Sequence, residues 1–177
     1  MTPALFGLAL LALQNAPPPK QSYDAKQDVT TYSSGDIRTG GMTGMSAEFT
    51  FPGKTPTRPA LVSMGFGALR VPDHDHPQPD ADLLQWKSVT MLDLTFAELK
   101  FSLPATEGFQ VSRNKTVELL FGHAIEEHVS VQLTPDEFAE VVAAPEFTVK
   151  FGTETKTIKG KSLDLLRKLA ASIPAKP

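Results

Sequence analysis

Two histidines and two aspartates stand next to one another in the run Asp73-His74-Asp75-His76. Imidazole nitrogens and carboxylate oxygens are ligands that Zn²⁺ and Cu²⁺ take in proteins. The surrounding segment 71–81 contains three prolines and no apolar periodicity, so we expect a surface loop between strands. Because adjacent ligands seldom complete a site, a metal at His74 and His76 needs a further ligand from elsewhere; the alternative is an exposed polar loop.

The residues that the fold would have to bring to that loop are His123, Glu126 and His128. His128 stands between Glu126 and Ser130 on the polar face of an expected strand, because side chains alternate between the two faces of a strand. No partner for acid–base chemistry is visible beside it, so the sequence favours a solvated surface histidine. No catalytic residue is predicted.

Two other patterns lack a part that their motif requires, and a third is complete but depends on the host. The glycine-rich stretch 39–45 is not followed by a Gly-Lys-Ser/Thr ending or a helix pattern, so it predicts a turn and not a phosphate loop. Ser63 does not form a nucleophile elbow, because Leu61 stands where that motif has glycine. The glycosylation sequon at Asn114 matters only in a eukaryotic secretory host.

The methionines suggest a second kind of metal chemistry. Thioether sulfur binds soft metals, and Met42, Met45, Met64 and Met91 could supply it. Methionine also fills irregular gaps in a core, and this interpretation is favoured here. The sequence therefore predicts no cofactor.

Composition excludes several classes of function. The chain of 177 residues contains no cysteine, which rules out thiol catalysis, disulfides and cysteine-ligated zinc or iron–sulfur sites. With 17 Lys plus Arg against 20 Asp plus Glu, the net charge is −3 and the basic residues are scattered. This pattern predicts no basic patch that would bind nucleic acid or an anionic membrane.

The first 16 residues have the pattern of a secretory signal peptide. The apolar run at 5–13 is too short to span a bilayer, and Ala16 is a small residue at a possible cleavage site. Two features argue against cleavage there, namely the absence of Lys or Arg before the run and Pro17 directly after Ala16, so cleavage nearer Ala12 and no cleavage are both open alternatives. The alternative is a buried first strand or helix. Residues 17–26 then predict an extended proline-rich linker, with order beginning near Tyr23.

The segment 125–151 predicts a strand, a helix and a second strand in direct succession. Apolar and polar residues alternate from Ile125 to Leu133, apart from Glu127 on the apolar face. Thr134, Pro135 and Glu137 match a helix N-terminus with a capping box. Pro145 ends the helix, and the alternation resumes at 147–151.

The remaining pattern predicts one domain over 27–173 with a tail at 174–177. A last helix is expected from a Ser162 cap, over about 163–173, and ends before Pro174. Further strands alternate with Gly/Pro turns, and the step from Phe96 to Leu99 fits either a hairpin or a bent strand. The strands are expected at 28–34, 46–51, 86–96, 99–103, 116–121 and 155–159.

Many strands and two short helices, at about 135–143 and 163–173, predict a mainly β fold: an antiparallel β-sandwich or a flattened barrel. We expect an exported bacterial protein, periplasmic or secreted, that acts as a non-catalytic binding or structural module. Its partner would be an unknown protein or small-molecule ligand in the cell envelope, and the mature chain would have no transmembrane span. The alternative is a metal-dependent hydrolase or metal carrier at His74 and His76, which metal analysis of His74→Ala with His76→Ala would test.

Overall fold

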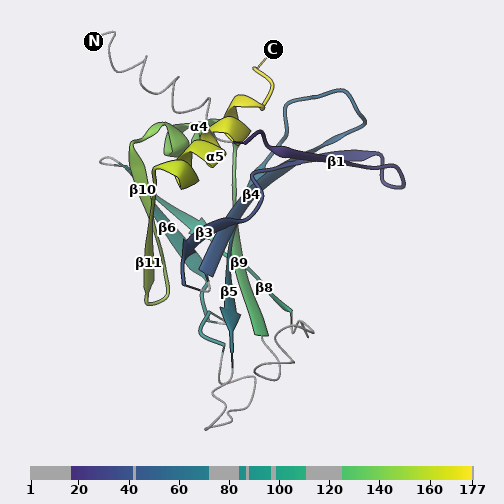
Figure 1. Ribbon diagram of the computed structural model, residues 1–177. Helices are drawn as coiled ribbons and strands as arrows, with labels where there is room; N and C mark the ends of the chain where they lie inside the picture. Colours follow the sequence, from purple (N-terminus) through teal and green to yellow (C-terminus); the bar gives the residue numbers. More distant parts are fainter. Residues whose placement is uncertain are drawn as a thin grey trace, which may run out of the picture.

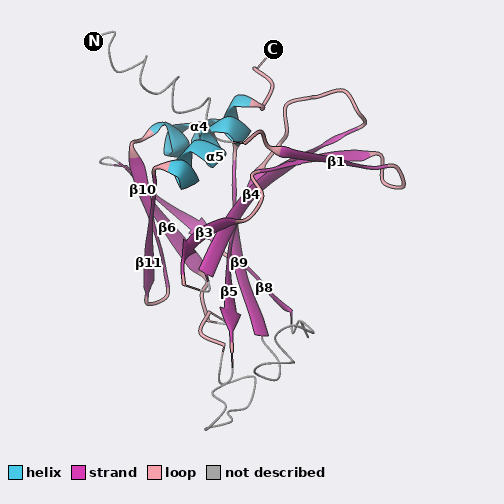
Figure 2. Cartoon of the chain, in the orientation of Figure 1, coloured by secondary structure: helices cyan, strands magenta, loops and turns pink. Residues whose placement is uncertain are grey.

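The structure, a computed structural model, describes residues 17–41, 43–71, 84–86, 88–96, 99–110 and 125–176. Within these ranges the chain forms two antiparallel sheets with two helices at one end (Figures 1 and 2). The predicted mainly β fold and the sandwich are confirmed. The flattened barrel is wrong, because the two sheets stay separate.

The larger sheet, sheet A, has seven strands in the order β1-β2-β4-β5-β9-β8, with β3 also paired to β4. All its pairings are antiparallel. The longest strands lie side by side at its centre, so sheet A supplies most of one wall of the core. Its strands are β1 (Lys20–Asp24), β2 (Val29–Ser33), β3 (Ile37–Gly40), β4 (Thr43–Pro52), β5 (Val62–Arg70), β8 (Thr106–Gln110) and β9 (Ile125–Leu133).

The smaller sheet, sheet B, has four strands in the order β11-β10-β6-β7. A hairpin joins β6 to β7, with Phe96 paired to Leu99, so the hairpin is the correct alternative at this step. The strand expected from Trp86 begins only at Met91, and Trp86 is buried ahead of it. The strands are β6 (Met91–Phe96), β7 (Leu99–Pro104), β10 (Glu146–Phe151) and β11 (Glu154–Lys159).

The core lies between the sheets and follows the alternation in the sequence. On β9 the residues Ile125, Val129, Val131 and Leu133 are at most 1% exposed, and Glu127 is buried on the same face, whereas the alternate residues face outward. Phe147, Val149 and Phe151 of β10 are equally buried from the other side. At about 1.5–3 kcal/mol for each large apolar side chain, this burial is what holds the sandwich together.

Helix α4 (Pro135–Ala143) has the predicted N-terminus. The Thr134 hydroxyl accepts a hydrogen bond from the Glu137 amide, and the Glu137 carboxylate accepts one from the Thr134 amide at 2.7 Å. Such a capping box satisfies amides that have no partner within the helix. Ala144 is extended, as expected for the residue before Pro145.

Helix α5 (Lys161–Ala171) begins one residue earlier than its predicted cap. Ser162 lies inside the helix, and Gly160 with φ 57° is the N-cap without a side-chain hydrogen bond. The Ser162 prediction is wrong because the turn after β11 needs a positive φ, which glycine adopts at little cost. Leu163, Leu166 and Leu169 form the buried side of the helix.

The two helices close one end of the sandwich (Figure 1). Helix α4 contacts β9 of sheet A and β10 of sheet B, and α5 contacts α4 and both sheets. Arg167 of α5 donates hydrogen bonds to the carbonyls of Val142 and Ala144, at 2.8 and 2.7 Å. A residue from α5 thus satisfies carbonyls at the C-terminus of α4, which has no basic residue in its own last turn.

Residues 17–26 contain a strand where a linker was expected. Strand β1 pairs with β2 along its whole length, from Lys20 opposite Ser33 to Asp24 opposite Val29. All five β1 residues are exposed, so there is no apolar alternation to signal the strand. Its prolines, at 17–19, lie ahead of the ladder and do not interrupt it.

Candidate functional site

The outward face of β9 and the neighbouring strand β5 differ sharply in side-chain size. Strand β9 presents Glu126 and His128, both exposed, whereas β5 presents Gly65 and Gly67 beside them. In the ladder, Gly67 is paired with His128, and the next strand, β4, places Gly44 opposite Gly67. The centre of sheet A therefore has long polar side chains on β9 beside two positions on β5 that have no side chain.

The imidazole of His128 lies directly over Gly65. A Cβ atom placed on Gly65 would be 2.6 Å from Cε1 and 2.7 Å from Nε2 of His128, closer than real Cβ contacts allow. A Cβ atom on Gly67 would meet only ordinary contacts, at 3.7 Å to the Glu127 carbonyl oxygen and 3.8 Å to His128 Nδ1. Glycine at position 65 is what lets the ring lie flat against the sheet.

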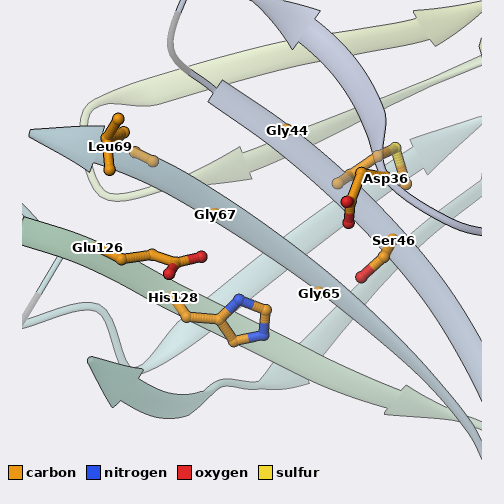
Figure 3. A pocket seen from close by; sticks show the side chains of 10 residues that line it. Asp36, Gly44, Ser46, Gly65, Gly67, Leu69, Glu126 and His128 are labelled. Atoms are coloured by element: carbon orange, nitrogen blue, oxygen red, sulfur yellow. The ribbon is translucent and has the colours of Figure 1, made fainter. Parts of the chain in front are cut away.

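These residues form an open hollow of about 280 Å³ on the outer face of sheet A, which we call the Gly65 hollow. Figure 3 shows Glu126 and His128 on one side of it, Asp36 and Ser46 on the other, and the glycines between them. The hollow is lined by Asp36, Gly44, Met45, Ser46, Gly65, Gly67, Ala68, Leu69, Glu126 and His128.

The lining of the Gly65 hollow is polar and acidic. Among the described residues, the lining carries two carboxylates, one imidazole and one hydroxyl, and no lysine or arginine. Within the described part of the chain, the side chains of Asp36, Glu126 and His128 make no hydrogen bond or ion pair. They are therefore available to a ligand, and the two carboxylates favour one that is positively charged.

A second hollow of about 330 Å³ lies on the same face, further along β4 and β5. The paired residues Glu48, Ser63 and Gln132 cross its floor from β4 through β5 to β9. Arg58, from the segment that carries Ala60 and Leu61, is hydrogen-bonded to the Asp136 carboxylate and the Pro174 carbonyl. The wall is completed by Phe49, Thr50, Ala60 and Leu61.

The opposite, inward face of β9 carries a different polar group. Glu127 is 2% exposed and accepts hydrogen bonds from Arg70 Nε at 2.7 Å and from the Trp86 amide at 2.8 Å. Arg70 and the Trp86 indole also donate to Glu154 Oε1, at 3.2 and 2.8 Å, and Lys156 lies 3.1 Å from Glu154 Oε2. These five residues, the Arg70 cluster, join β5 and β9 of sheet A to β11 of sheet B.

The Arg70 cluster is electrically balanced, and among the described residues no buried side-chain nitrogen or oxygen lacks a hydrogen-bond partner. It has two positive and two negative side chains, and the Arg70 guanidinium also lies 5.1 Å from the Trp86 ring centroid. Burial acts to raise the pKa of Glu154, but the hydrogen bonds from Trp86, Lys156 and Arg70 outweigh it, so this pKa is lower than its ordinary value. The cluster holds the sheets together and leaves no charge for a ligand.

The predicted metal residues fall into two groups. His74, His76 and His123 lie outside the described residues, so the metal site at the loop stays a prediction. Glu126 and His128 are described, and the fold brings them together with Asp36 at the Gly65 hollow. Within the described residues, no group of three or more His, Asp or Glu side chains is placed to hold a metal ion.

The other candidates have ordinary positions. Met45 and Met64 are buried in the core, as the packing interpretation predicts, and Met91 is exposed; Met42 and Asn114 lie outside the described residues. Ser63 lies on strand β5, opposite Gln132, and lines the second hollow. The strand predicted at 116–121 also falls outside the described residues.

Sequence reasoning missed two features of the Gly65 hollow. These are its glycine floor, made by Gly65 and Gly67, and the carboxylate of Asp36 in its lining. A signal for the floor was present, because Gly65 and Gly67 are two residues apart inside a strand and so share one face. Asp36 gave no signal, since it reaches the hollow from the connection before β3. Its place is set by the packing of β3 on β4.

Comparisons with protein families, with curated proteins and with solved structures found no match. Among the described helices, none is long and apolar enough to cross a membrane.

Proposed function

We propose that this chain is a non-catalytic binding module that acts outside the cytoplasm and holds its ligand on the outer face of sheet A. The observation that carries the proposal is the Gly65 hollow. It is an open depression lined by Asp36, Glu126 and His128, which have no partners of their own among the described residues. Glu126 and His128 stand on a paired strand, which fixes their backbone positions before any ligand arrives and lowers the entropic cost of binding.

The chemistry of the lining points to an amine or a guanidinium as the bound group. Asp36 and Glu126 offer carboxylate oxygens from opposite sides of the hollow, and Ser46 offers a hydroxyl. The floor of Gly65 and Gly67 lets a narrow group approach the sheet closely. A lysine or arginine side chain of a partner protein, or a small amine, has this shape and charge.

Binding is favoured over catalysis because the polar groups are not organised as a catalytic set. Catalytic nucleophiles are hydrogen-bonded to a base, which a third group orients. No such bond links Ser46 to His128 within the described residues, and the hollow is open to water. Both features support recognition of a group and not its chemical conversion.

The proposal is tested by titrating the full-length ¹⁵N-labelled chain with n-butylamine and n-butylguanidine, followed by NMR. We expect saturable shifts at the hollow, over 44–46, 65–69 and 126–130, and much smaller shifts with n-butanol, which has the same length and no charge. The variant Glu126→Gln with Asp36→Asn should lose the amine response. Equal responses to amine and alcohol, or no saturable response to either cation, would contradict the proposal.

The matched control is Glu48→Gln, which removes a carboxylate from the second hollow on the same face. It changes the net charge by one unit and leaves the Gly65 hollow intact, so the amine response should persist. Loss of the response in this control would mean that overall charge, and not the hollow, attracts the probe.

The extracellular or periplasmic site of action rests on the leader pattern at 1–16. Expression with its own N-terminus in an exporting bacterial host should yield a periplasmic or secreted protein whose mass lacks the leader. Recovery of the intact chain only from the cytosol would contradict this part of the proposal. It would leave the ligand proposal standing.

A further inference from the structure

Strand β1 forms one end of sheet A in the described part of the chain. It pairs with β2 on one side, and no described strand lies on its other side. Its five residues are all exposed, and the hairpin of β1 and β2 extends away from the sandwich (Figure 1). In an antiparallel ladder, alternate residues of such an edge direct their N–H and C=O groups outward, where another strand can bind them.

The sequence of β1 is complementary to itself. If two copies run antiparallel about a two-fold axis at Ser22, Lys20 of each copy lies opposite Asp24 of the other. On the other face, Gln21 lies opposite Tyr23, whose side chain is 38% exposed. We propose that a second copy of this chain pairs with β1 in this register and joins the two larger sheets into one.

The two charges of β1 are available for this contact. Neither Lys20 nor Asp24 has an ion pair within the described residues. Asp24 accepts the amides of Lys26 and Gln27 through Oδ1, at 2.8 and 3.3 Å, which leaves Oδ2 for the partner. The Lys20 side chain lies over Gly35 in the single chain and turns toward Asp24 of the second copy.

The described edge strands of sheet B do not offer the same contact. Strand β11 also carries opposite charges two residues apart, but Glu154 and Lys156 are paired with each other and belong to the Arg70 cluster. Strand β7 carries Lys100, which is paired with Asp93, and it has no carboxylate. Compared with β7 and β11, β1 alone combines opposite charges that have no ion pair among the described residues with full exposure.

Five residues per copy bury much less than the roughly 1,200–2,000 Å² of a standard interface, so the dimer should be weak and depend on concentration. Sedimentation velocity over a wide concentration range measures this in the full chain. We expect Lys20→Glu to raise the dissociation constant about tenfold or more, because two attractive pairs become repulsive. Lys26→Glu, in the turn of the same hairpin, changes the charge equally and should have little effect.

Cysteine crosslinking tests the register, since the natural chain contains no cysteine. Ser22→Cys should form a disulfide-linked dimer under mild oxidation, because the proposed axis brings the two Cα atoms within disulfide range. Gln21→Cys alone should crosslink poorly, but a mixture of Gln21→Cys and Tyr23→Cys should crosslink efficiently. A monomeric wild type at all concentrations, or equal crosslinking of Ser22→Cys and Gln21→Cys, would overturn the proposal.

This interface is independent of the proposed ligand function. Lys20 is not among the residues that line the Gly65 hollow, so Lys20→Glu should retain the response to n-butylamine. The variant Glu126→Gln with Asp36→Asn should retain the dimer. Each proposal can therefore fail without the other.

Discussion

The two faces of strand β9 use carboxylates in opposite ways. Glu127 points inward, is 2% exposed, and is bonded to Arg70 and Trp86. Glu126 and His128 point outward and have no partner among the described residues. Neighbouring glutamates thus have different roles, one structural and one open to a ligand, because successive side chains of a strand point to opposite faces.

The difference follows from the surroundings of each charge. A carboxylate removed from water is stable only with charged or hydrogen-bonding partners, and the Arg70 cluster supplies them. The outward carboxylate is stabilised by water, so it needs no partner and can exchange water for a ligand. This contrast can be tested by changing each face in turn.

The largest effect is expected from Glu127→Ala. The substitution leaves the half-buried Arg70 and the Trp86 amide without their acceptor, so the free energy of unfolding should fall by about 3–5 kcal/mol. The matched variant Glu126→Ala, on the outward face, should change it by no more than about 0.5 kcal/mol. Urea unfolding followed by Trp86 fluorescence measures both values. Similar losses for the two variants would remove the distinction between the faces.

Replacing both charged partners should recover stability. In Arg70→Met with Glu127→Leu, neither buried charge remains, and such apolar replacements are often neutral or stabilising. We expect this double variant to unfold at a higher urea concentration than Glu127→Ala. If the double variant is as unstable as Glu127→Ala, the hydrogen bonds of the Arg70 cluster themselves stabilise the fold, and the loss in Glu127→Ala is not due only to an unpaired buried charge.

A smaller effect on the free energy of unfolding is expected at Glu154, and it should depend on pH. The pKa of Glu154 is lowered in the folded protein, so its stabilising contribution is complete above its unfolded pKa, about 4.3, and is lost as pH falls through the lower, folded pKa. Glu154→Gln should cost about 1–2 kcal/mol at neutral pH, because it loses charge-assisted hydrogen bonds. The difference in free energy of unfolding between Glu154→Gln and the wild type, measured by urea unfolding, should become smaller below pH 4. A difference that stays constant into acid would show that the Glu154 charge does not contribute.

The smallest effects are expected on the outward face, at the glycine floor. Gly67→Ala should stabilise the chain by about 0.4–1 kcal/mol, because alanine restricts the unfolded chain and its Cβ meets only ordinary contacts here. Gly65→Ala should gain less and should shift the imidazole signals of His128 in NMR spectra, because its Cβ occupies the place of the ring. Equal stabilisation with unchanged His128 signals would contradict the proposed packing of the ring.

The regular elements could be predicted wherever a local pattern carried them. The alternation at 125–133, the capping box at Thr134 and the stop at Pro145 each depend on neighbours within a few residues, and all three are confirmed. The Ser162 cap was wrong because the φ of Gly160 decides where α5 begins. Strand β1 was missed because it is exposed and is stabilised by backbone pairing with β2. Such pairing requires no alternation of apolar and polar side chains in the sequence.

The candidate site was accessible to sequence reasoning only in part. Glu126 and His128 were recognised as outward residues of one strand, and Glu127 as an exception on the apolar face. The residues that complete the Gly65 hollow and the Arg70 cluster were not recognised, because Asp36, Arg70 and Glu154 come from distant parts of the chain. Contacts of this kind depend on strand order, which local periodicity does not contain.

The amino-acid sequence alone determined the two-sided character of the strands, the short capped helix and the absence of thiol chemistry. Only the tertiary structure decided that Asp36 and His128 line the same hollow and that the charge of Glu127 is paired with Arg70. The physical reason is range: periodicity and capping act between neighbours along the chain, whereas a hollow or a charge cluster exists only after pairing has brought remote strands together.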